Sequence, residues 1–217
     1  MTTEGIGRFV CVMALSVDAL FVLVMQDVDD ETAIRTTPAA IFLRHATRAQ
    51  QWVALRYRLL RETLPFALFA NTPLYSLPTR HLRMVTVTHM TRSDGTPLWP
   101  VPFTSLRYRD AAWFSTTGVP LYFYRLGWAY LGVCPIPTAD ETALVSGLMI
   151  PTDLTEMTSR LQIADAWSPH VVKVTAGLMM LSRERRYEEG VARIMTGLGL
   201  RTAVPLREKQ EVAGVAD

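Results

Sequence analysis

Two histidines on one apolar stretch are the first candidates for a metal site. His81 and His89 lie eight positions apart, and an even spacing puts both side chains on the same face of a strand. At 3.3 Å per residue they are separated by about 26 Å, too far to bind one metal ion. The other histidines, His45 and His170, also lack the spacing of metal ligands. The sequence therefore predicts no metal site.

One cysteine and one pair of carboxylates are the remaining candidates for catalysis. Cys134 stands beside Pro135 at the end of an apolar run, where a structural thiol is favoured over a nucleophile. It is far in sequence from Cys11, the other cysteine, so we expect two buried apolar side chains rather than a disulfide. Asp140 and Glu141 are neighbours in a predicted turn, and no third carboxylate is placed to work with them. A glycosidase-like pair is not favoured.

An acidic run from Asp27 to Glu31 suggests a calcium-binding loop. Such a loop needs glycine at its sixth position and glutamate at its twelfth. Counted from Asp27, the sixth residue is not glycine and the twelfth is Pro38, so a solvated linker is favoured. The sequence also lacks the G-x-S-x-G, P-loop, dinucleotide and H-E-x-x-H motifs. We therefore predict no catalytic residue and no cofactor.

Composition is typical of a folded protein with one substantial core. Of the 217 residues, 49% are hydrophobic and 19% are charged, which argues against wholesale disorder. The length suits one domain with an appendage. A formal net charge of +2 argues against a dedicated nucleic-acid-binding protein, whose affinity would need a dense basic surface.

The stretch from Phe9 to Met25 is almost continuously apolar. It is short for a membrane span and carries Asp18 near its middle. Glu4 and the absence of a small-residue cleavage site also make it a poor signal peptide. An element buried in the protein or between subunits is favoured over the membrane and targeting alternatives, and no membrane partner is expected.

The segment Gly118–Pro137 predicts a β-hairpin at the centre of an antiparallel sheet. Phe123 and Tyr124 point to opposite faces because side chains alternate along a strand. Gly127 supplies the backbone freedom for a tight reversal. Pro135 cannot donate to a ladder, so the second strand ends there.

Short apolar runs before and after this hairpin predict more strands. Asp94-Gly95 is a hairpin turn, and Pro100 in the returning strand predicts a position near the sheet edge. Thr104–Asp110 predicts a short helix. Recurrent turn signals favour a β-sandwich or a barrel-like sheet. The other expected strands are 66–69, 74–77, 82–90, 98–101 and 142–150.

The two ends of the chain predict helices. One spans residues 6–25, and a long one starts at Thr37-Pro38, runs to about Glu62 and is terminated by Pro65. Ser168-Pro169 starts a helical hairpin formed by residues 169–182 and 185–198. In the long helix one face is apolar, with Phe42, Ala46, Ala49, Val53 and Leu60, and the opposite face is polar, with Arg44, Arg48, Gln51, Arg58 and Glu62. These arginines could touch a polyanion, but a solvated face or an intersubunit ion-pair surface is favoured.

These elements together predict an α+β fold in which a helical bundle packs with an antiparallel β-sandwich or barrel-like sheet. The helical part is residues 1–64 and 167–200, the β-rich part is 65–166, and 201–217 form a polar tail. Trp99, Trp113 and Trp128 could stack on a ligand if exposed, but packing in the core or between subunits is favoured.

The order of several short motifs resembles the head-to-tail adaptor (connector) proteins of tailed bacteriophages. The resemblance covers roughly residues 38–198 and rests on the order and spacing of six weak motifs, followed by the helical hairpin. The motifs are ATRAQQWVALRYRLLRETLP (46–65), YSLP (75–78), LRMV (82–85), PLWPVPFTSLRYRD (97–110), GVPLY (118–122) and PIP (135–137).

The resemblance implies a structural virion protein that is not an enzyme. It implies a homo-oligomeric ring, a dodecamer, that is assembled in the host cytoplasm. In the phage neck the ring would bind the portal and a tail, stopper or nozzle protein, and DNA would pass through its lumen without sequence readout. Another neck component, such as a stopper or tail-completion protein, is the first alternative. A carbohydrate-binding β-sandwich or an enzyme is the second.

Nine residues are candidates for contacts with partners under this hypothesis. Three are arginines of the long helix, three are tryptophans of the β-rich part, and three belong to the tail. They are Arg44, Arg48, Arg58, Trp99, Trp113, Trp128, Arg201, Leu206 and Val212.

Overall fold

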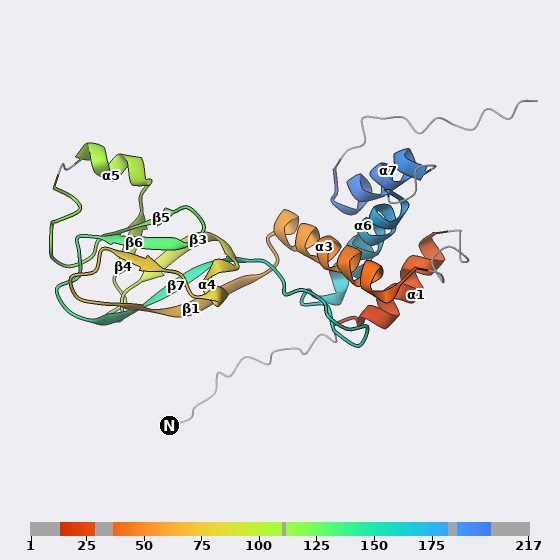
Figure 1. Cartoon of the computed structure of the whole chain (residues 1–217), viewed down its shortest axis with the longest axis horizontal. Coiled ribbons are helices and arrows are strands. Elements are labelled where there is room, and N and C mark those ends of the chain that lie inside the picture. Colours follow the sequence, from red (N-terminus) through yellow and green to blue (C-terminus); the bar gives the residue numbers. More distant parts are fainter. Residues whose placement is uncertain (1–13, 29–36, 110–111, 182–185, 201–217) are drawn as a thin grey trace, which may run out of the picture. The chain divides into compact units, whose positions relative to one another are not determined.

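The computed structural model describes residues 14–28, 37–109, 112–181 and 186–200, which form two compact units (Figure 1). The first unit combines Met1–Val53 with Asp153–Asp217, and the second is Ala54–Thr152. The strands β1 to β7 all belong to the second unit. The domain boundaries that the sequence predicts, after residues 64 and 166, stay a prediction.

Helix α1 runs from Val17 to Asp27 and starts at a side-chain cap. Ser16 has an extended backbone, and its Oγ accepts a hydrogen bond from the backbone N–H of Ala19 at 3.3 Å. The predicted helix over residues 6–25 is therefore wrong at 14–16, because the serine cap starts the helix inside the apolar stretch. Residues 1–13 lie outside the described part. No helix within the described ranges is both long and apolar enough to span a membrane.

Helix α3 runs from Ala39 to Tyr57 and buries four of the five residues of the predicted apolar face, whereas Leu60 lies beyond the end of the helix and is only partly buried. The helix ends five residues before the predicted end at Glu62. Arg58 takes the left-handed conformation, with φ of 54°, which stops the helix. Pro65 does not terminate it and instead lies in strand β1. The four fully buried residues of this face are Phe42, Ala46, Ala49 and Val53.

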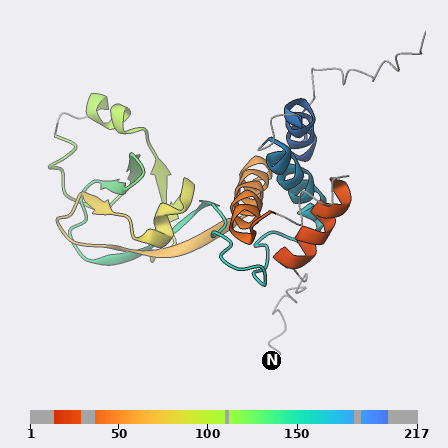
Figure 2. The ribbon, with the colours of Figure 1, turned by 45° about the vertical axis from the view of Figure 1, so that its right-hand side comes forward.

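Helices α6 (Ser168–Leu181) and α7 (Tyr187–Gly197) form the predicted antiparallel hairpin, and they lie side by side in both ribbon views (Figures 1 and 2). The short 3-10 helix η1 (Asp165–Trp167) precedes α6. The backbones of α6 and α7 approach each other closely at two glycines. A Cβ atom on Gly177 would lie 2.6 Å from the carbonyl oxygen of Gly190, and a Cβ on Gly190 would lie 2.8 Å from that of Gly177. Only glycine allows this spacing.

The second unit is built on one curled seven-stranded sheet with the order β1-β7-β3-β4-β5-β6-β2. This architecture confirms the predicted α+β class and its barrel-like alternative. The short helices α4 (Thr79–Leu82) and α5 (Phe103–Arg109) belong to this unit. The strands are β1 (Arg61–Leu68), β2 (Leu74–Ser76), β3 (Met84–Thr91), β4 (Pro97–Pro100), β5 (Tyr122–Leu126), β6 (Tyr130–Cys134) and β7 (Glu141–Met149).

Strand β4 accounts for two corrections to the sequence predictions. It pairs antiparallel with β3 but parallel with β5, so the sheet is mixed rather than purely antiparallel. It also lies fourth of seven in the sheet, not near an edge as Pro100 predicted. Proline is tolerated here because β4 pairs with each neighbour through two residues only and Pro100 is its last residue. The hairpin β5–β6 is formed as predicted, with Gly127 at φ of 61°, but it lies off the sheet centre.

The two faces of the sheet differ in what covers them. The inner face of the curl holds the main core, a continuous cluster that includes Leu68, Met84, Phe123 and Leu131. On the outer face a small cluster forms around Tyr124 and includes Leu106 of α5 and Cys134 of β6. Phe123 and Tyr124 therefore point to opposite faces, as the alternation predicts.

Candidate interaction surfaces

Helix α5 and the loop after it cover part of the outer face through contacts between aromatic rings. The ring of Trp113 lies 5.5 Å from those of Phe103 and Tyr124, edge to face in both pairs. The backbone oxygen of Trp113 also accepts a bond from Cys134 Sγ at 3.7 Å. Tyr124 in turn fills the space that a Cβ atom on Gly132 would need. Trp113 is thus half-buried and holds α5 against the sheet.

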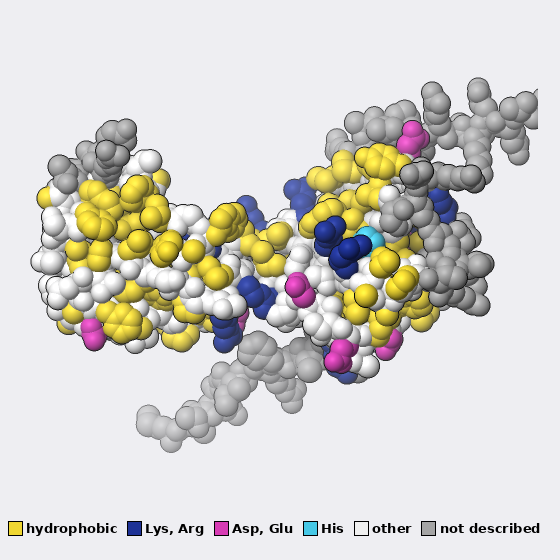
Figure 3. Space-filling model, in the orientation of Figure 1, with side chains coloured by type: hydrophobic (Ala, Val, Ile, Leu, Met, Phe, Trp, Pro, Cys, Tyr) yellow, Lys and Arg dark blue, Asp and Glu magenta, His cyan; other side chains and the backbone are white. Residues whose placement is uncertain are grey.

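The rest of the outer face exposes large apolar side chains. We define the outer-face group as Trp99, Leu126 and Tyr130, whose side chains share this face by strand alternation. Trp99 is 64% exposed, and Leu126 and Tyr130 are opposite each other in the β5–β6 register. Figure 3 shows hydrophobic side chains gathered on this unit around the positions of α5 and β5. Exposed apolar side chains gathered on one face are typical of a surface that binds another protein.

Arg125 links the start of β3 to the turn of the β5–β6 hairpin. Its guanidinium donates to the backbone oxygens of Met84 and Val85, the latter at 3.0 Å, and to that of Trp128 at 3.1 Å. It also lies 5.7 Å from the centre of the Trp128 ring, a cation–π contact. Burial lowers the pKa of Arg125. We call this set of Arg125 contacts the Arg125 clamp. Trp128 is 70% exposed, so the clamp presents a fixed aromatic side chain to solvent.

Arg125 bridges strands β5 and β3 beside an open pocket. The first two residues of β4 pair with β3 and its last two pair with β5. Beyond the end of β4, strands β3 and β5 are therefore not joined through it. A cavity of about 370 Å³ lies there, lined by Val87, Val101 and Tyr124 among others. Arg125 also lines this cavity and bonds across it to β3.

The polar face of α3 carries two of the predicted arginines. Arg44 and Arg48 are exposed, and neither forms an ion pair within the described part of the chain. His45 lies between them in sequence but is buried, and neither ring nitrogen has a hydrogen-bond partner among the described residues. Burial and then the two neighbouring positive charges lower the pKa of His45. Arg58, just after the helix, is also exposed.

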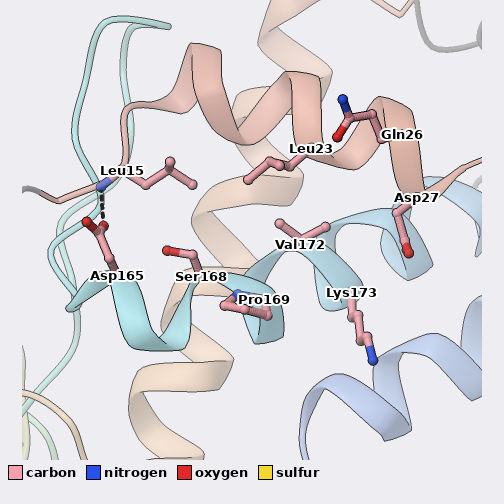
Figure 4. Close-up of a pocket in the computed structure, with 9 residues that line it drawn as sticks. All are labelled: Leu15, Leu23, Gln26, Asp27, Asp165, Ser168, Pro169, Val172 and Lys173. Carbon is pink, nitrogen blue, oxygen red and sulfur yellow. Dashed lines mark hydrogen bonds between the residues drawn. The ribbon is translucent and has the colours of Figure 1, made fainter.

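An open groove of about 600 Å³ lies between α1 and α6 (Figure 4). Leu23 of α1 and Val172 of α6 face each other across it. Asp165 accepts a hydrogen bond from the backbone N–H of Leu15 at 2.7 Å and closes one end. The full lining is Leu15, Leu23, Gln26, Asp27, Asp165, Ser168, Pro169, Val172 and Lys173.

The residues that could do chemistry are engaged in structural contacts. Asp140 accepts a hydrogen bond from the backbone N–H of Ala70 at 2.7 Å. Glu141 pairs with Arg92 at 2.9 Å. Among the described residues, no three histidine, cysteine or acidic side chains are grouped as metal ligands would be.

The predicted interface residues that the structure describes belong to both units. Trp99 and Trp128 are exposed in the second unit, Trp113 is half-buried there, and Arg44 and Arg48 belong to the first unit. Arg201, Leu206 and Val212 lie outside the described residues. Their roles in binding partners stay predictions.

Sequence reasoning missed two features, the Arg125 clamp and the α1–α6 groove. Arg125 precedes a glycine turn and stands three residues before Trp128, a spacing that brings both side chains to one end of a hairpin. This signal was available. No signal for the groove exists, because it depends on which faces of α1 and α6 meet.

A family model described as SU10 adaptor protein matches residues 16–197, which include most of both units. No curated protein matches the chain.

Proposed function

The chain belongs to the SU10 adaptor protein family, and from this membership we propose that it forms a ring that joins the phage capsid to the tail. Family membership implies a structural, non-enzymatic phage adaptor in the virion neck that contacts other virion proteins. The proposal adds that identical subunits, in a dodecamer, bind beneath the portal and carry a tail, stopper or nozzle protein on the opposite side. DNA passes through the lumen without sequence readout, and assembly takes place in the host cytoplasm.

The family match over residues 16–197 is the observation that carries this proposal. The exposed side chains of the second unit are consistent with it, because Trp99 and Trp128 are large, rigid and well exposed, as anchors of protein interfaces are. Head-to-tail contacts between identical subunits are the natural way to close a ring. In this proposal Trp99 and Trp128 contact other protein subunits.

The exposed arginines support a second part of the proposal. Arg44 and Arg48 leave an unpaired basic face on α3, within the described residues. Such a face either pairs with acidic side chains of a neighbouring subunit or lies near DNA. We assign it to the neighbouring subunit, since a lumen that lets DNA slide needs few fixed phosphate contacts.

Purified full-length protein and portal provide the main test. The protein is expected to sediment as a closed ring, alone or on addition of portal, and negative-stain images should show the ring on the portal. Portal rings that stay bare at saturating protein, together with a monomeric protein, contradict the proposal. Binding to tail components but not to portal identifies a stopper or tail-completion protein instead.

We further propose that residues 201–217, with Arg201, Leu206 and Val212, bind the portal. This segment follows α7 directly and shows no core pattern. Removing it should leave the folding of both units unchanged by circular dichroism and abolish co-sedimentation with portal. A truncated protein that still assembles complete tailed particles rules this out.

A further inference from the structure

The α1–α6 groove is apolar in its middle, around Leu23 and Val172, and polar at both ends. Leu23 is 38% exposed although it points into the groove, and the neighbouring Val22 is 54% exposed. Asp27 and Lys173 lie at the far end from Leu15. Asp27 is already paired with Arg193 of α7. Between these ends the groove offers mainly apolar contact, and Lys173 is an exposed charge at its far end.

Ser168 provides an independent sign that something binds in the groove. It is only 7% exposed, and its Oγ has no hydrogen-bond partner among the described residues. In Figure 4 the hydroxyl points toward the Leu15 end of the groove. Buried hydroxyls are rarely left unpaired, because burial without a hydrogen bond is unfavourable. A backbone N–H or carbonyl of a bound peptide would satisfy Ser168 Oγ.

We propose that the segment Phe9–Met13 of a second copy of this chain binds in this groove. The segment reads FVCVM, five apolar residues in succession, which cannot stay in water without cost. In extended form it spans about 17 Å. Helix α1, which forms one wall of the groove, has 11 residues and spans about 17 Å, so the extended segment is about as long as that wall.

The geometry at Leu15 points to a second copy rather than to the same chain. The N–H of Leu15 is bound to Asp165, and its carbonyl accepts the N–H of Leu161 at 2.9 Å, so the backbone direction there is fixed. To enter its own groove, the chain would have to reverse just before Leu15. The residues available for that turn are Val12, Met13 and Ala14, which include no glycine, proline, asparagine or aspartate. A turn would also remove Val12 and Met13 from the segment that fills the groove.

The inference rests on the proposed ring, in which every subunit has neighbours. In that ring, Phe9–Met13 of each subunit binds in the α1–α6 groove of a neighbouring subunit. The chain's own cysteines allow a direct test. Cys11 lies within the segment, and Lys173 is an exposed residue of the groove. In a Cys134→Ser background, Lys173→Cys is expected to form a disulfide with Cys11 of another copy on mild oxidation. Non-reducing electrophoresis should then show covalent dimers and higher multimers.

Matched variants make this result specific. Thr196→Cys, exposed on α7 and outside the groove, should give no multimers above background. Cys11→Ser in the Lys173→Cys protein, with Cys134 retained, should abolish them. A disulfide that forms only within one chain overturns the inference, and so does the absence of multimers.

Labelling of Cys11 gives a second readout. In the Cys134→Ser protein, maleimide should react with Cys11 at least tenfold more slowly than in the same protein carrying Leu23→Asp, which places a charge in the groove. Equal rates overturn the inference. If rings form on the portal while these cross-links and protections are absent, only the binding of Phe9–Met13 to a neighbouring subunit is wrong. If no ring forms at all, the proposed function fails as well.

Discussion

The inner and outer faces of the β-sheet are built from the same strands but differ in how complete they are. Leu131 on the inner face is fully buried, whereas Tyr130, its neighbour in β6, is 44% exposed on the outer face. The inner face is closed by residues of the unit itself, from Leu68 in β1 to Leu131 in β6. The outer face is covered only around Tyr124, by α5 and Trp113. The inner face therefore stabilises the unit, and the outer face remains available for partners.

The largest expected loss of stability comes from shortening a side chain on the inner face. Leu131→Ala should lower the free energy of unfolding by about 3 kcal/mol, because a fully buried leucine leaves a cavity. Chemical denaturation measures this loss. Leu126→Ala, on the adjacent strand but in the outer-face group, is the matched control and should lose less than about 1 kcal/mol. Equal losses from both variants would show that the two faces contribute alike.

Removal of the Arg125 clamp should rank second. Arg125→Met keeps the bulk but leaves the backbone oxygens of Met84 and Val85 without their donor, which should destabilise the unit by about 2 kcal/mol. Arg125→Lys keeps the charge but not the forked geometry and should fall between wild type and Arg125→Met. Trp128 fluorescence should shift to the red in the methionine variant only. An unchanged denaturation midpoint in Arg125→Met contradicts a structural role for the clamp.

Acid should weaken the inner face through His81. This side chain is buried and its ring packs against Phe66 at 5.2 Å. Burial lowers its pKa below the ordinary value of 6.5, so the unfolded chain binds the proton more readily than the folded one. The contribution to stability is complete above about pH 6.5 and is lost as the pH falls through the lowered pKa of the folded state.

The measurement is the loss of unfolding free energy between pH 7 and pH 5. The loss should be smaller in His81→Leu than in wild type, and what remains should include the contribution of His45, whose pKa is also lowered by burial. His89→Gln removes an exposed imidazole from the same unit and should keep the full loss. If His81→Leu loses as much unfolding free energy between pH 7 and pH 5 as wild type, groups other than His81 cause the loss.

The smallest effect on stability is expected on the outer face. Trp99→Ala should change the free energy of unfolding by no more than about 0.5 kcal/mol, because the side chain is mostly in solvent. Sedimentation should nevertheless show weaker ring assembly or weaker binding to a neck partner. Thr88→Ala, another exposed residue of this sheet, should leave assembly unchanged. A Trp99→Ala protein that assembles normally would remove Trp99 from the interface.

Local patterns predicted most of the elements because each had a local physical cause. The Asp94-Gly95 turn and the alternation of Phe123 and Tyr124 are properties of neighbouring residues. The apolar face of α3 was likewise predictable from its helical period. These features depend on few residues and on no distant contact. Helix α6 begins at Ser168 as predicted, but the serine cap is wrong, because Ser168 has a helical backbone after η1 and its hydroxyl has no hydrogen-bond partner among the described residues.

The errors occurred where distant contacts decide the structure. Arg58 adopts a left-handed backbone that propensity alone would not assign to arginine, and the chain then enters β1, which pairs with β7 eighty positions later. Pro65 is accepted in β1 because this strand is at the edge of the sheet. The position of β4 between β3 and β5 requires a parallel pairing that no local pattern indicates. The candidate surfaces could be predicted only as residue types, since exposure depends on the finished sheet.

The close contact of Gly177 and Gly190 has a consequence beyond the packing of α6 and α7. At the other end of the hairpin, a Cβ atom on Gly197 would lie 2.9 Å from the carbonyl oxygen of His170. Contacts at both ends leave α7 little freedom to slide or roll along α6. The point at which the chain continues past Leu200 is therefore fixed with respect to α6. In a ring of identical subunits, all these departure points would lie at one height and at equal intervals around the axis.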